Sequence, residues 1–254
     1  MISVIDKPCS PSEYNGLPGI MEADAAIRNS AEALDKLVDA GSVAVRSSLF
    51  AHGEVGAFLL HKHWEVPDGE CMIERPGTHP SGKPALITSA RRFASSPAIA
   101  PTRFRVDPQS GQLMALEFSS DEFAIAAWRA LLDYPDFLED ICRLVGDSGL
   151  ADQVGIATFA RAAVPMAQGE EMVEENWNNQ SVLSAQVLVE DEEKVVVPTG
   201  WSFVSDKEDD VLASTCIAYC MLFAGAHCVH HYNRPDVIEP QQRISSPPVC
   251  TLHD

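Results

Sequence analysis

The uneven mixing of strand-like and helix-like segments is the sequence feature that most limits the fold. A parallel α/β fold needs regular alternation, because each crossover between parallel strands uses a helix. Here the last helical pattern runs from Pro135 to about Gly146, and strand patterns dominate the chain after it. The order therefore predicts an α+β fold, with a mostly antiparallel sheet and a few packed helices.

Two further segments carry helical patterns. Over residues 24–39, apolar residues recur at helical spacing and Gly41 stands where a C-terminal cap belongs. Ser119 and Glu122 have the spacing of a capping box, which predicts a second helix running to about Asp133.

The strand candidates differ in their surroundings. Residues 55–66 are rich in aliphatic and aromatic residues and are followed by turn residues, which favours a strand. Residues 76–103 are rich in Pro, Ser and Gly and predict a basic loop region. The other candidate strands are 112–118, 154–164, 181–189 and 194–204. The acidic turn 190–193 predicts that the last two form a hairpin.

The length of 254 residues suits one large domain. The Pro-containing residues 1–20 predict an extended N-terminal segment, and residues 234–254 predict a Pro-rich tail. A single α+β domain is expected over residues 21–233.

The charge balance excludes some partners. With 18 Lys and Arg against 37 Asp and Glu, the net charge of −19 repels phosphate backbones and anionic lipid, so we expect neither nucleic acid nor membrane as a partner. No apolar run reaches the length of a membrane helix, and the first residues lack the pattern of a secretory signal. Seven scattered cysteines predict thiols in a reducing, cytoplasmic setting.

The segment that follows Leu60 carries two histidines at alternate positions. On a strand, His61, His63 and Glu65 would share one face. Imidazole and carboxylate groups are common ligands of Zn, Fe and Cu, so this face predicts a divalent metal site with Glu65 as a ligand or acid–base group. The alternative is a polar strand face exposed to solvent.

A second carboxylate, Glu117, lies in the strand candidate 112–118. Alternation places Met114, Leu116 and Phe118 on the core face and Glu117 on the opposite one. If this strand lies beside the His61 strand, Glu117 is a candidate metal ligand or general base. The alternative is a solvated carboxylate.

The C-terminal part carries further metal ligands, including His227, Cys228 and His230. His227 and His230 are candidate metal ligands, and neighbouring histidines would make Cys228 a candidate reactive thiol. The alternative is that these cysteines are small core residues.

The block Leu59-Leu-His-Lys-His-Trp-Glu65, the blocks Pro101-x-x-Phe104 and Ala115-Leu-Glu-Phe118, and the late Cys/His cluster resemble an uncharacterised, mainly fungal group of proteins. Those proteins have an LLHKHF-like strand and a Cys/His-rich C-terminus. Trp64 and Glu65 stand where Phe and Asp are usual in the group. The resemblance singles out the same candidate residues but implies no reaction, because the group has no assigned activity.

These observations favour a metal-dependent enzyme that acts on a small molecule, as a hydrolase, a lyase or dehydratase, or an oxidase. His61 and His63 would hold the metal ion. One alternative is a non-catalytic binding or assembly protein. Another is a metal-free enzyme that uses His63 or Glu117 as a base, or Cys228 as a nucleophile.

Overall fold

The computed structural model describes most of the chain up to residue 231, namely residues 4–47, 55–93, 98–107, 110–158, 164–165, 167, 170–177, 180–187, 195–203, 217–223 and 226–231. The described helices are α1 (Pro11–Asn15), α2 (Ile20–Arg28), α3 (Ala31–Ser47), α4 (Glu122–Leu132) and α5 (Pro135–Asp147). The described strands are β1 (Val4–Pro8), β2 (Val55–Leu59), β3 (Glu70–Thr78), β4 (Pro84–Arg92), β5 (Ala100–Val106), β6 (Leu113–Ser119), β7 (Val154–Thr158), β8 (Glu171–Trp177), β9 (Gln180–Gln186), β10 (Val195–Ser202), β11 (Ile217–Phe223) and β12 (Ala226–His231).

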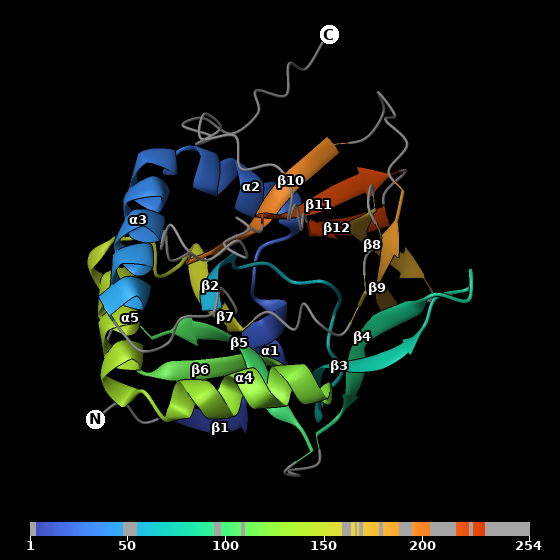
Figure 1. The fold of residues 1–254 in the computed structure, drawn as a ribbon, viewed down its shortest axis with the longest axis horizontal. Helices are drawn as coiled ribbons and strands as arrows, with labels where there is room; N and C mark the ends of the chain where they lie inside the picture. The colour runs from blue at the N-terminus through green and yellow to red at the C-terminus, as the bar shows by residue number, and fades with distance from the viewer. Residues whose placement is uncertain are drawn as a thin grey trace, which may run out of the picture.

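The strands form one mixed sheet that closes on itself (Figure 1). Neighbours pair in the order β1-β6-β3-β4-β9-β8-β12-β11-β10-β2-β7-β5, and β5 also pairs with β6. The pairs β1–β6 and β3–β6 are parallel, and the other described pairs are antiparallel. The α+β class is therefore confirmed, with a sheet that is mostly antiparallel.

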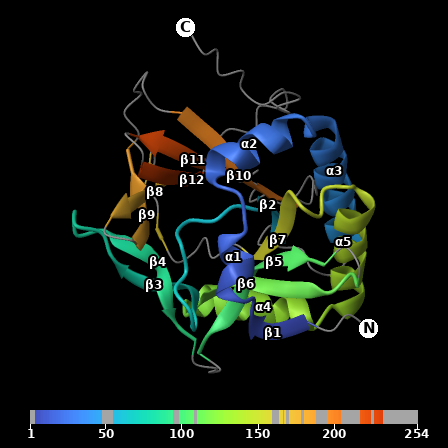
Figure 2. The same cartoon turned by 180° about the vertical axis from the view of Figure 1, so that it is seen from behind.

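Two apolar clusters lie on the two faces of β6. The larger cluster joins residues of α2 to α5 with one face of β2, β5, β6 and β7. The smaller cluster joins Tyr14 of α1 and the segment after β2 with the other face, through residues such as Phe58, Met72 and Leu116. Figure 2 shows α1 near the middle of this second side of the molecule. Helix α1 and the segment after β2 therefore pack in the same apolar cluster.

The helix predictions were right about position and partly wrong about boundaries. The expected helix over 24–39 is two helices, since α2 ends at Arg28 and Ala31 begins α3. Ile27 and Leu34 are buried in the same cluster on either side of the break, so the apolar spacing does not reveal it. Gly41 lies inside α3, where a Cβ atom would clash with the Phe203 ring.

The N-cap of helix α4 lies two residues after the predicted one. Asp121 is the N-cap, and its Oδ1 accepts hydrogen bonds from the backbone N–H groups of Phe123 and Ala124 at 2.9 and 3.2 Å. Ser119 instead belongs to β6. The helix ends before Asp133, and α5 follows as predicted.

Several predictions about strands and loops were wrong. Residues 76–103 are largely strand, because β3 and β4 form a hairpin in which Thr78 pairs with Pro84. The turn residues of this region gather at its tip, where Gly82 has φ +87. Strands β9 and β10 do not pair with each other: β9 pairs with β4 and β8, and β10 with β11 and β2.

The ends of the chain differ in what the structure describes. Within residues 1–20, where an extended segment is expected, the chain forms β1, α1 and the first residue of α2. The predicted tail 234–254 and the turn 190–193 lie outside the described residues. Among the described helices, none is both long and apolar enough to cross a membrane.

Candidate functional site

Strand β2 ends earlier than the sequence pattern predicts. It stops at Leu59, and the chain then leaves the sheet, so the predicted strand to Val66 is wrong. The departing segment is held against the N-terminal part of the chain by backbone hydrogen bonding from Lys62 N–H to the Pro18 carbonyl at 3.0 Å. The Asn15 side chain donates to the Val66 carbonyl at 2.9 Å and accepts from its N–H at 2.7 Å. His61 and His63 therefore lie in a clamped crossing segment.

The crossing segment still brings the two histidines together. His61 and His63 are 5 % and 9 % exposed, and their ring centroids are 4.9 Å apart. Glu65 does not join them. Its side chain is 69 % exposed and forms an ion pair with Lys62 at 2.6 Å.

The Glu117 carboxylate is the centre of a buried polar group. Tyr14 donates a hydrogen bond to Glu117 Oε1 at 2.9 Å, and His63 Nε2 lies 3.5 Å from the same oxygen. The Arg103 guanidinium donates to Glu117 Oε2. We call Tyr14, His61, His63, Arg103 and Glu117 the Glu117 cluster.

Glu117 reaches this position through an irregularity in the sheet. The pairing of β5 with β6 shifts between Arg103, opposite Glu117, and Phe104, opposite Ala115. Such a bulge breaks the simple alternation of side chains. Leu116 consequently packs in the same apolar cluster as Tyr14, and Glu117 accepts a hydrogen bond from the Tyr14 hydroxyl. The prediction that Leu116 and Glu117 face opposite sides was therefore wrong.

The strand that carries Glu117 is not next to the histidine strand. Strands β7 and β5 lie between β2 and β6 in the sheet. The contact between Glu117 and His63 arises because the chain after β2 crosses the interior, past α1. Tyr14 contacts this crossing segment directly, since its hydroxyl accepts a hydrogen bond from the His63 backbone N–H at 3.3 Å.

The cluster fixes the charge of several of its members. Burial raises the pKa of Glu117, but the charges of Arg103 and His63 and the hydrogen bonds it accepts outweigh burial and hold this pKa at about 2. Burial, followed by the Glu117 charge, raises the pKa of Tyr14 well above its usual value. Burial and the neighbouring His63 lower the pKa of His61 to about 3. Near neutral pH the cluster therefore holds an anionic carboxylate, a neutral phenol and a neutral His61.

The tautomer of His61 follows from its backbone contact. Its Nδ1 lies 2.7 Å from the Leu59 carbonyl oxygen, which can only accept a hydrogen bond. Nδ1 therefore carries the proton, and Nε2 carries the lone pair. A neutral imidazole held in this way is the form that binds a metal ion or accepts a proton.

A second carboxyl group, Glu74 on β3, lies close to the cluster. Ser119 donates a hydrogen bond to Glu74 Oε1 at 3.0 Å. Burial, with smaller contributions from the charges of Glu117 and Asp121, raises the pKa of Glu74 to about 7. Two nearby carboxyl groups thus have pKa values displaced in opposite directions, a feature that often accompanies functional sites.

Sequence reasoning missed the parts played by Tyr14 and Arg103. Tyr14 lies in the segment expected to be extended, and Arg103 in the segment expected to be a basic loop. Hairpin pairing of β5 with β6 was a partial signal for Arg103, but simple pairing from Val106 and Leu113 would set Arg103 opposite Leu116, and only the register shift sets it opposite Glu117. No signal marked Tyr14.

The C-terminal candidates lie on β12. The backbone of His227 pairs with Leu222, that of Cys228 with Met221 and that of His230 with Tyr219, all on β11. Their side chains lie outside the described part of the structure. Among the described residues, no group of three or more His, Cys, Asp or Glu side chains is arranged to hold a metal ion.

The fold and the site define an α+β protein with a closed mixed sheet and a buried carboxylate–imidazole–guanidinium cluster. Comparisons of the chain with protein-family models, with curated proteins and with solved structures each found no match. The geometry of the site is therefore the basis for a functional proposal.

Proposed function

We propose that the protein is an enzyme that transfers a proton to or from a small molecule, with His63 as the acid–base group. One observation carries this proposal. His63 Nε2 lies 3.5 Å from Glu117 Oε1 and 3.4 Å from a guanidinium nitrogen of Arg103. A protonated Nε2 has a carboxylate to donate to, and a deprotonated Nε2 has a guanidinium to accept from. A group that gains and loses a proton in each cycle needs a partner in both states.

The other members of the cluster support this role by position and charge. Glu117 stays anionic, so it stabilises a positively charged imidazole, as the carboxylate of a catalytic triad does. The Tyr14 hydroxyl donates a hydrogen bond to the Glu117 carboxylate and accepts one from the backbone N–H of His63, and Tyr14 is only 2 % exposed. The Arg103 side chain is 21 % exposed, so we place substrate approach on its side.

The setting of the reaction follows from charge and thiol chemistry. The net charge of −19 disfavours nucleic acid, and we propose a small-molecule substrate. Cys9, Cys71 and Cys142 are buried free thiols, which suits a reducing compartment, and we propose the cytoplasm.

Nitrogen NMR on protein labelled at histidine tests the proposal directly. The His63 Nε2 signal, assigned from its loss in a His63→Gln variant, should change between its protonated and deprotonated forms over the pH range in which the protein stays folded. A His63 ring that keeps one form over this range would overturn the proposal. His61, whose pKa is about 3, provides the internal control that should not change.

Conversion of small molecules gives the second test. A metabolite extract incubated with the protein should lose a substrate and gain a product, and both changes should vanish with His63→Gln. His79→Gln is the matched control, because His79 lies in the β3–β4 turn and contacts Ser81. Conversion that survives His63→Gln would remove His63 from the reaction.

A metal-dependent reaction is the second candidate function, and the tautomer of His61 favours it. The Leu59 contact fixes the His61 proton on Nδ1, so Nε2 carries the lone pair, and the His63 ring is 4.9 Å away. Glu117 fits less well as a third ligand, because both of its oxygens already accept hydrogen bonds and Oε2 binds Arg103. In this reading Zn, Fe or Cu would need a further donor, for which His227, His230 and Cys228 are the candidates.

Metal analysis separates the two candidates. For a metal enzyme, untagged protein should carry a stoichiometric divalent metal ion that is lost in both His61→Ala and His63→Ala. Under the metal-free proposal, a metal-depleted sample keeps its conversion, and His61→Ala keeps more of it than His63→Ala. Retention of metal by both alanine variants would exclude a His61–His63 metal site.

A further inference from the structure

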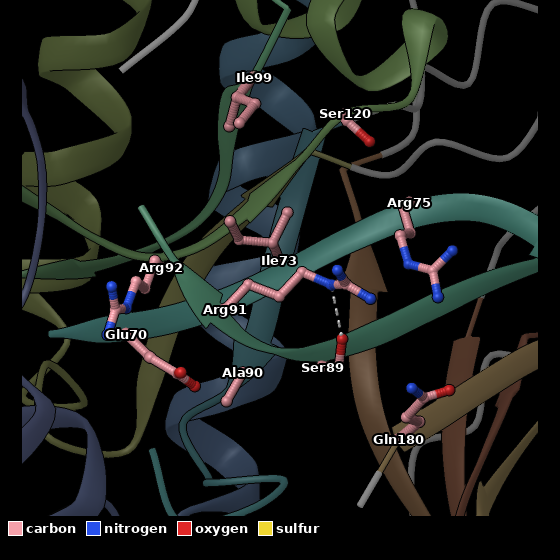
Figure 3. Close-up of a pocket in the computed structure, with 10 residues that line it drawn as sticks. All are labelled: Glu70, Ile73, Arg75, Ser89, Ala90, Arg91, Arg92, Ile99, Ser120 and Gln180. Carbon is pink, nitrogen blue, oxygen red and sulfur yellow. Dashed lines mark hydrogen bonds between the residues drawn. The ribbon is translucent and has the colours of Figure 1, made fainter. Parts of the chain in front are cut away.

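A cavity of about 710 Å³ lies on the β3–β4 hairpin, apart from the Glu117 cluster (Figure 3). Ile99, just before β5, and Ser120, just after β6, border it. Ligand sites in proteins usually measure roughly 300–1,000 Å³, so the cavity has room for a small organic molecule. The Glu117 cluster contributes none of the residues that line it.

The charge of this cavity is opposite to that of the chain. Three arginines and a single carboxylate line it, in a protein of net charge −19. Glu70 stands opposite Arg92 in the β3–β4 register, so these two charges offset each other. Arg75 and Arg91 remain, and within the described part of the chain neither forms an ion pair.

The two remaining arginines converge on one face of the hairpin. Ser89 stands opposite Ile73, and its hydroxyl accepts a hydrogen bond from Arg91 Nε at 3.1 Å. This bond turns the Arg91 side chain along the strand, and Figure 3 shows its guanidinium directed toward that of Arg75. The Arg75 Nε atom is buried and has no hydrogen-bond partner among the described residues. Two like charges held on one face repel each other, and an anion between them would remove the repulsion.

The remaining walls indicate the rest of the ligand. Ile73, Ile99 and Ala90 supply apolar surface, while Ser89, Ser120 and Gln180 supply neutral polar groups. We propose that this cavity, the arginine pocket, binds a small organic anion whose carboxylate or phosphate group lies between Arg75 and Arg91 and whose apolar part contacts Ile73. A long polyanion is not expected, because the net charge of −19 would repel it.

Titration calorimetry at constant ionic strength tests the pocket with four probes. These are phenyl phosphate, benzoate, inorganic phosphate and the neutral molecule benzyl alcohol. We expect at least one of the two aromatic anions to bind more tightly than inorganic phosphate and benzyl alcohol. The tighter of phenyl phosphate and benzoate identifies the anionic group that the pocket prefers. Arg75→Gln and Arg91→Gln should each weaken binding by about tenfold or more, since a guanidinium–anion hydrogen bond is strong and directional.

Arg143→Gln is the matched control, because this arginine is exposed and pairs with Asp140 on α5. It should bind the probes as the unaltered protein does. Three results would overturn the proposal: neither aromatic anion binds, benzyl alcohol binds as well as benzoate, or Arg75→Gln and Arg91→Gln bind the anions unchanged. His63→Gln should leave binding unaffected, so a failure of the pocket and a failure of the proposed reaction are distinguishable.

Discussion

Arginine side chains have opposite roles in the Glu117 cluster and in the arginine pocket. In the cluster, the Arg103 guanidinium donates to a carboxylate that is itself buried. In the pocket, Arg75 and Arg91 share a strand-pair face that supplies no carboxylate to either. An arginine neutralised inside the fold contributes to its stability, whereas cavity arginines that have no carboxylate partner are available to a ligand. Equivalent substitutions should therefore cost stability in one region and binding in the other.

The largest expected effect is the loss of the buried carboxylate. Glu117→Gln should lower the free energy of unfolding at pH 7 by about 3 kcal/mol, because it leaves the Arg103 charge without its anion in a poorly solvated site. Chemical denaturation measures this change. The matched control is Glu65→Gln, which alters an exposed ion pair and should change stability by less than about 1 kcal/mol.

The same variant has a pH signature. The pKa of Glu117 is lowered from 4.5 to about 2 in the folded protein, so its contribution is complete above pH 4.5 and is lost as the pH falls toward 2. The stability difference between Glu117→Gln and the unaltered protein should shrink over that range. A difference that stays constant down to pH 2 would mean that the cluster does not owe its stability to the carboxylate charge.

A smaller effect, with the opposite pH dependence, is expected at Glu74. Its pKa rises from 4.5 to about 7 on folding, so the folded state favours the protonated form. The stabilisation is complete below pH 4.5 and is lost as the pH rises through 7. Relative to the unaltered protein, Glu74→Gln should therefore be more stable at pH 8 than at pH 4, by on the order of 1 kcal/mol. Parallel stability curves for the two proteins from pH 4 to pH 8 would contradict the assignment.

The comparison also shows what the sequence can predict. Helices α4 and α5 were predictable because a cap, a first-turn proline and apolar spacing act within a few residues. The β3–β4 hairpin was not, because Pro, Ser and Gly residues in and around its tip gave the whole segment the composition of a loop. The arginine pocket depends on this hairpin, so three scattered arginines could not be recognised as one site.

The sequence indicated three residues of the Glu117 cluster, but it did not indicate how the fold brings them together. His61, His63 and Glu117 were singled out as residues able to carry chemistry, and the structure brings them together. The route was different, because β2 ends at Leu59 and a bulge redirects Glu117. The crossing segment is held by hydrogen bonds between Asn15 and Val66, which lie 51 residues apart in the chain. Neither alternation nor local propensity contains that information.

The smallest expected change in stability is in the arginine pocket. Arg75→Gln and Arg91→Gln should each alter the free energy of unfolding by no more than about 0.5 kcal/mol, and a slight gain is expected because each removes a repulsion between like charges. Thermal or denaturant unfolding in buffer without carboxylate or phosphate measures this change. If either variant loses as much stability as Glu117→Gln, the pocket arginines are paired within the fold. The contrast between a structural and a ligand-binding arginine would then fail, because Arg75 or Arg91 would play the same part as Arg103.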